Sequence, residues 1–67
     1  MRMFAERLKE LREEKGLSFV RLAEATGLGK TALNYWETGK TDITSDNLVV
    51  LAKFFNVSVG YMVGTED

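Results

Sequence analysis

The hydrophobic residues of this chain recur at helical spacing and fall into five segments. Across residues 3–15, Phe4, Leu8 and Leu11 lie at i, i+4 and i+7, which is one face of an α-helix. Further helices are expected at residues 19–26, at about 29–39, after Thr44 and after Ser58. The breaks between them fall at residues typical of turns and helix ends, which are Gly16, Gly27, Gly39 and Asn56. The pattern is helical throughout and predicts an all-α fold of five helices without a strand.

The third segment has two faces of different character. It begins near Gly29 or Lys30 and ends at Thr38–Gly39. The inward face is hydrophobic and consists of Ala32, Leu33 and Trp36. The outward face is largely polar and consists of Lys30, Thr31, Asn34, Tyr35 and Thr38. Because both sets follow helical spacing, one face is expected in the core and the other in solvent or against a partner.

Length and composition limit the architecture. A chain of 67 residues is expected to form a single domain over 1–67, with residues 65–67 either the true end or the start of a linker. It contains no Cys and no His, so we expect no disulfide and no metal site. No hydrophobic run is long enough to span a membrane, and no signal-peptide core is present. A cytoplasmic location without a membrane partner follows by default.

The net charge of −1, from nine Lys and Arg against ten Asp and Glu, argues against nucleic-acid binding through bulk charge. Any contact with DNA must therefore depend on where the cations lie.

Two motifs resemble known ligand-binding loops but lack residues that those loops require. Gly29-Lys30-Thr31 resembles the end of a phosphate-binding loop, but Glu24 occupies the position of the required first glycine. Asp42, Thr44 and Asp46 alternate like the start of a calcium loop, but the required Gly and Glu are missing, and a helix-capping loop explains them better. Without His or Cys, and with its carboxylates scattered, the chain is not expected to be an enzyme or to use a cofactor or a small-molecule substrate.

The arrangement of the second and third segments carries the strongest signal. Two short helices are joined through Thr26-Gly27-Leu28, and the second has a polar outer face, which is the layout of a helix-turn-helix. Around this unit, residues 7–64 resemble the Cro and phage-repressor type of helix-turn-helix DNA-binding domain. The resemblance lies in the order and spacing of short pieces, which are residues 7–12, 16–18, 22–23, 26–28, 36–37, 39–40, 47–48, 51–53 and 56–58. It implies a compact five-helix, lambda-repressor-like fold whose helices 2 and 3 form the helix-turn-helix.

The resemblance also implies functional residues. The base-reading positions of the family match Lys30, Thr31, Asn34 and Tyr35. Their chemistry agrees, since Lys can donate to guanine, Asn can pair with adenine, and Thr or Tyr can contact a thymine methyl. The phosphate-contacting positions match Ser18, Gly29 and Lys40. The alternative for the first group is an ordinary solvated polar face.

Two further groups concern structure and assembly. In similar proteins an Arg at the end of the first helix pairs with a Glu at the end of the third, here Arg12 and Glu37; the alternative is two independent surface charges. Related repressors dimerise through the loop before the fourth helix and through the last helix. The matching residues are Ile43, Val57, Val59 and Tyr61, which could equally belong to the core, Val57 above all.

Two departures from the family remove phosphate attraction. Phe19, followed by Val20, replaces the common Gln after Ser18, and the usually basic loop after Lys40 reads Thr41-Asp42-Ile43. Two functions therefore stay open. The first is a sequence-specific repressor or regulator that binds double-stranded DNA as a homodimer on a two-fold operator. The second is a protein-interaction module on the same fold, such as an antitoxin, with Phe19, Val20 and Tyr35 as its apolar contacts.

Overall fold

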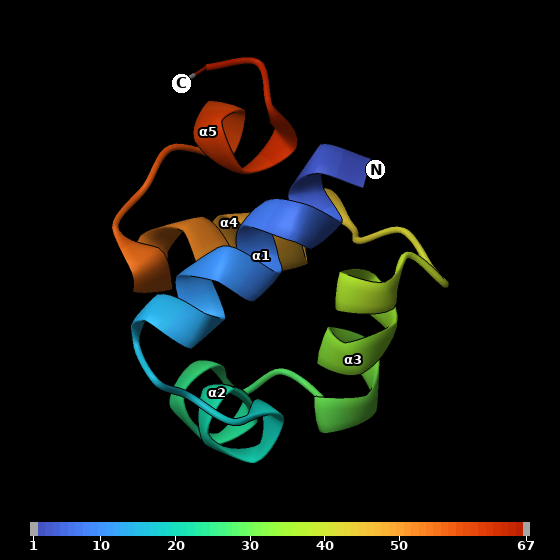
Figure 1. Cartoon of the computed structure of the whole chain (residues 1–67), viewed down its shortest axis with the longest axis vertical. Helices are drawn as coiled ribbons and strands as arrows, with labels where there is room; N and C mark the ends of the chain where they lie inside the picture. The colour runs from blue at the N-terminus through green and yellow to red at the C-terminus, as the bar shows by residue number, and fades with distance from the viewer. Residues whose placement is uncertain (1, 67) are drawn as a thin grey trace.

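Five α-helices form the fold in this computed structural model, which describes residues 2–66 (Figure 1). They are α1 (Arg2–Glu14), α2 (Phe19–Thr26), α3 (Lys30–Thr38), α4 (Ser45–Phe55) and α5 (Val59–Val63). No strand occurs within these described residues. The predicted all-α, five-helix fold is confirmed. The first helix ends at Glu14, one residue earlier than expected, because Lys15 and Gly16 already form a turn.

Hydroxyl side chains begin three of the helices. Ser18, Thr44 and Ser58 each accept a hydrogen bond from the backbone N–H three residues further on, which satisfies one of the amides that a helix start leaves unpaired. At the other ends, Gly27 and Asn56 adopt left-handed backbone conformations with φ of 77° and 56°. A helix continues poorly through such a residue, so the expected breaks fall where the chain turns.

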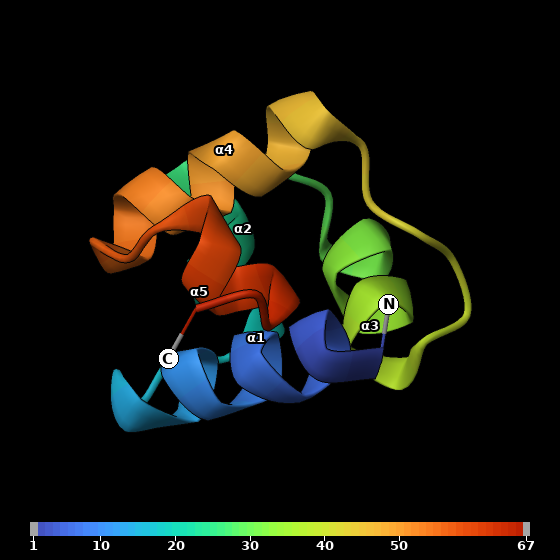
Figure 2. The ribbon, with the colours of Figure 1, turned by 90° about the horizontal axis from the view of Figure 1, so that it is seen from above.

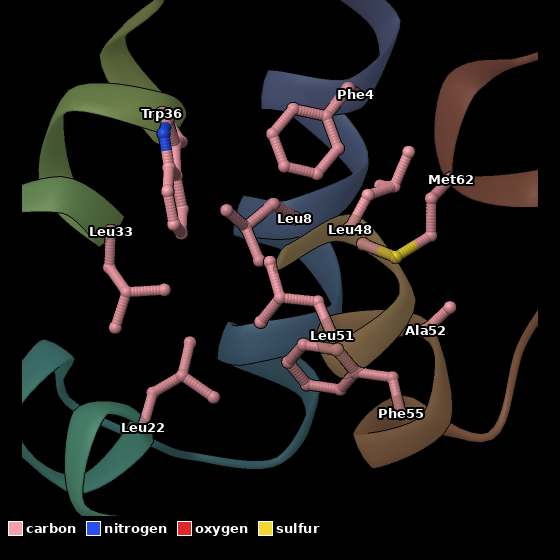
Figure 3. Packing of buried hydrophobic residues seen from close by; sticks show 10 residues of the cluster. All are labelled: Phe4, Leu8, Leu22, Leu33, Trp36, Leu48, Leu51, Ala52, Phe55 and Met62. Atoms are coloured by element: carbon pink, nitrogen blue, oxygen red, sulfur yellow. The ribbon is translucent and has the colours of Figure 1, made fainter. Parts of the chain in front are cut away.

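The core lies where the apolar faces of all five helices meet (Figure 3). Ten buried side chains form it, which are Phe4, Leu8, Leu22, Leu33, Trp36, Leu48, Leu51, Ala52, Phe55 and Met62. In Figure 3, Leu33 and Trp36 of α3 project from one side toward Leu8 of α1. Trp36 is 6% exposed, so its predicted burial is confirmed.

The packing of the helices leaves one side of α3 uncovered. α1 packs against α3 and α5, and α2 packs against α3 and α4. Seen from above, α4 and α1 run along opposite edges of the molecule, with α3 at one end (Figure 2). The α1 and α2 helices therefore hold α3 by its inner face.

The last described residues fold back onto α1 and α5. Arg7 donates to the backbone oxygens of Tyr61 and Glu66, and its guanidinium lies 4.1 Å from the centre of the Tyr61 ring. The Glu66 carboxylate accepts a hydrogen bond from the Ser58 hydroxyl at 2.7 Å. Of the residues 65–67 interpreted as an end or a linker start, Asp67 lies outside the described residues. Among residues 2–66, no helix combines the length and the apolar character that crossing a membrane demands.

Candidate nucleic-acid interface

The turn between α2 and α3 is a three-residue connection that hydrogen bonds tie to the end of α2. The Gly27 N–H donates to the Ala23 carbonyl at 2.8 Å, and the Thr26 hydroxyl donates to Leu22 O and accepts from the Leu28 N–H. Leu28 packs against the core. Because α2 also buries Leu22 and α3 buries Leu33 in the same core, the two helices form one rigid unit.

The outer face of α3 presents four side chains together. Lys30, Thr31, Asn34 and Tyr35 are all exposed, at i, i+1, i+4 and i+5, which is one side of a helix. On the opposite side, Leu33 is fully buried. The structure thus brings the four predicted base-reading residues into one exposed row that can donate, accept and make apolar contacts.

The Tyr35 side chain of this row contacts a lysine. The Lys40 ammonium lies 5.1 Å from the centre of the Tyr35 ring, a distance at which a cation is attracted to a ring face. Tyr35 remains 39% exposed. Lys40 follows the helix C-cap Gly39, so the cation predicted to contact phosphate also lies beside the exposed face of α3.

The other two predicted phosphate contacts lie at helix starts. The Ser18 hydroxyl already accepts from the Arg21 N–H at 3.1 Å to begin α2. Gly29 begins α3 with no side chain over its first amides. Both residues are exposed. The backbone N–H groups at these two helix starts, and the O–H that Ser18 still has to donate, are the donors that a phosphate could use.

An ion pair ties α1 to the C-terminal end of α3. Arg12 Nε lies 2.6 Å from Glu37 Oε2 and Arg12 Nη2 lies 3.1 Å from Glu37 Oε1, a two-point contact between planar groups. The two side chains are 14% and 4% exposed. The pairing that the resemblance implied is present, so Arg12 and Glu37 are not independent surface charges.

The same arginine also covers Phe19. Its guanidinium lies 4.3 Å from the centre of the Phe19 ring, and its Nη1 donates to Leu17 O at 2.7 Å. The hydrogen bond that Arg12 donates to Glu37 raises the pKa of Arg12, although burial lowers it, so Arg12 stays charged. Phe19 packs against the core beneath it. The phenylalanine that replaces the common Gln therefore has a structural contact.

The residues proposed for dimerisation differ in exposure. Ile43, Val57 and Tyr61 are half-buried and pack against the core. Val59, at the start of α5, is 37% exposed. Only Val59 of these four thus presents much of its surface to another molecule. Within residues 2–66, no group of three Asp, Glu, Cys or His side chains is placed to hold a metal ion.

Comparison with known proteins identifies this arrangement. The helix-turn-helix family of Cro/C1 type matches residues 8–62. The chain belongs to this family. Its members are DNA-binding transcription regulators, which are not a class of enzymes. The lambda-repressor-like assignment of the fold is confirmed, and the exposed row of this helix-turn-helix protein lies on the second helix of the motif.

Curated relatives are longer regulators. The chain is 35% identical over 65 residues to the HTH-type transcriptional regulator YobD of Bacillus subtilis, covering 97% of this chain and 58% of that protein. It is 34% identical over 64 residues to the HTH-type transcriptional activator BcrR of Enterococcus faecalis, covering 96% and 31%. For the regulator ImmR of Bacillus subtilis the identity is 33% over 61 residues, covering 91% and 48%. The chain thus spans between 31% and 58% of the length of these relatives. No solved structure matches it.

Sequence reasoning missed three contacts between a cation and an aromatic ring, two of them at the site. The Arg12–Phe19 contact, the Lys40–Tyr35 contact and the Arg7–Tyr61 contact each join side chains that no spacing rule connects. The one available signal was Phe19 itself, a large apolar residue at a usually polar position. Its nearness to Arg12 could have been inferred from the turn between α1 and α2.

Proposed function

We propose that this helix-turn-helix protein binds specific sequences of double-stranded DNA as a homodimer on a two-fold operator and represses transcription there. The observation that supports this most is the exposed row of Lys30, Thr31, Asn34 and Tyr35 on a rigidly held α3. A second helix of this kind enters the major groove, where its N-terminal residues reach base edges. Action in the cytoplasm, and action of residues 1–67 as one DNA-binding unit, are part of the same proposal.

Each residue of the row has a distinct proposed partner. Lys30, in the first turn of α3, donates to guanine O6 and N7, and Asn34 pairs with adenine. Thr31 and Tyr35 contact thymine methyl groups. Lys40 and the backbone amides after Ser18 and Gly29 hold the phosphates on either side. These contacts would fix α3 in register with the bases.

The proposed dimer uses Val59 as its exposed contact, and the half-buried Ile43 and Tyr61 contribute the surface that they leave exposed. Two copies on a two-fold operator place their recognition helices about 34 Å apart, one turn of DNA. Repression follows if the operator overlaps a promoter. The relative BcrR is named an activator. A reporter gene placed behind the selected operator distinguishes repression from activation for this chain.

The rival proposal is a protein-interaction module. Of its three apolar contacts, Val20 is 47% and Tyr35 39% exposed, but Phe19 is half-buried beneath Arg12. An interaction surface without Phe19 is small, so the structure favours DNA.

Selection of bound sequences from random DNA at two salt concentrations tests the function. DNA binding is expected to enrich one palindromic sequence and to weaken steeply with salt, because the bound Lys residues displace counterions. A pool that stays random at both concentrations would contradict the proposal. Binding that ignores salt would favour the interaction module.

A further inference from the structure

The outer side of α4 carries an apolar pair between two opposite charges. Val49 and Val50 are 40% and 37% exposed, while Asp46 and Lys53 on either side of them are also exposed. The four residues lie at i, i+3, i+4 and i+7, so they form one stripe along the helix. The buried residues of α4 occupy the other side. In Figure 2, α4 runs along an edge of the molecule and no helix lies on its outer side.

No side chain among the described residues pairs with either charge of this stripe. Within residues 2–66, Asp46 and Lys53 take part in no ion pair or hydrogen bond of their side chains. The neighbouring Phe54 is half-buried and lies under Lys15, whose ammonium is 5.6 Å from its ring centre. The stripe includes none of the residues proposed for DNA contact or for the operator dimer.

The stripe is complementary to itself. Asp46 and Lys53 lie about 10.5 Å apart along the axis, at 1.5 Å per residue, and the midpoint between them falls between Val49 and Val50. A two-fold axis through that midpoint, perpendicular to α4, places Asp46 of one copy opposite Lys53 of the other, twice. The same axis stacks the four valines between the two ion pairs. A parallel arrangement in register would instead oppose Asp46 to Asp46 and Lys53 to Lys53.

We propose that a second copy of this chain docks antiparallel on the Asp46–Val49–Val50–Lys53 stripe of α4. Such a contact is isologous, because the same patch serves on both copies. Its area is small, so it is a weak contact that forms at high local protein concentration. This contact is separate from the operator dimer and does not depend on DNA binding, and it links copies that occupy different half-sites or different operators.

Reversing the charges one at a time and then together tests this geometry in sedimentation equilibrium without DNA. Asp46→Lys and Lys53→Asp are each expected to weaken self-association at least about tenfold, because each opposes like charges at both ends of the stripe. The double variant restores the pairs and is expected to associate like the natural chain. A mixture of the two single variants is expected to form a mixed pair, because each charge then meets its opposite.

Matched controls separate the stripe from total charge. Lys9→Asp and Glu10→Lys change exposed charges of α1 by the same amounts and are expected to leave association unchanged. If Asp46→Lys lowers the helix content seen by circular dichroism, Lys53→Asp and Val50→Gln test the proposal in its place. Each is expected to weaken self-association. A natural chain that stays monomeric at its highest soluble concentration would overturn the proposal. Association that the single reversals do not weaken would also overturn it.

Discussion

Arg12 and Glu37 show how single residues hold α3 in place. The pair joins the end of α1 to the end of α3 and is nearly removed from solvent, with Glu37 only 4% exposed. Breaking one partner leaves the other charge buried without its hydrogen bonds. Arg12→Met and Glu37→Gln are each expected to lower the free energy of unfolding by about 1–3 kcal/mol. Urea denaturation followed by circular dichroism measures this.

The exposed pair of Arg21 and Glu24 serves as the control for this prediction. Its atoms are 3.6 Å apart and its side chains are 75% and 63% exposed, so solvent screens the attraction. Arg21→Ala is expected to change stability by less than about 0.5 kcal/mol. Equal effects of Arg21→Ala and Glu37→Gln would show that the buried pair has no special role.

Lys40 illustrates a residue whose proposed contribution is charge alone. Because phosphate contacts carry no sequence information, Lys40→Ala is expected to weaken all DNA sequences alike and to lower the log–log salt slope by about one unit per subunit. Fluorescence anisotropy over a salt series measures the slope. An unchanged salt slope together with an altered base preference would contradict this prediction. It would mean that Lys40 acts through Tyr35, beside which it lies.

Among the elements, α3 is held to the core by Leu33 and Trp36. Trp36 is its largest inward side chain and is 6% exposed. Trp36→Ala is expected to cost roughly 3–5 kcal/mol, most of the stability of so small a domain. Thermal unfolding of the variant measures the loss. Iodide should quench the native tryptophan fluorescence poorly, and strong quenching would contradict the burial.

The elements were also what the sequence predicted best, since their signals are local. Ser18 and Thr44 begin helices, and Gly27 ends one, through bonds within a few residues of themselves, so the bounds of α2 and α4 could be predicted. The contact of Arg7 with Tyr61 joins residues 54 positions apart, and no spacing rule reports such a pair. The four residues on α3 came from the family resemblance, and their shared face came from helical periodicity.

At the scale of the whole molecule, a net charge of −1 means that binding relies on a few placed cations. With about three phosphate charges neutralised per subunit, a dimer is expected to show a log–log salt slope near −5. A footprint on the selected operator should cover two half-sites centred one helical turn apart. Protection of a single half-site at saturation would rule out the symmetric dimer.

The exposed face of α3 is proposed to read DNA, and substitutions along this face give the sharpest test of that proposal. Anisotropy titrations of the selected operator compare the natural chain with Lys30→Ala, Thr31→Ala, Asn34→Ala and Tyr35→Ala. Lys30→Ala is expected to cost about 1–3 kcal/mol of binding free energy and to relax preference at one base pair. Tyr35→Ala is expected to alter preference at a thymine. If all four variants bind the operator as the natural chain does, then α3 is not the reading helix.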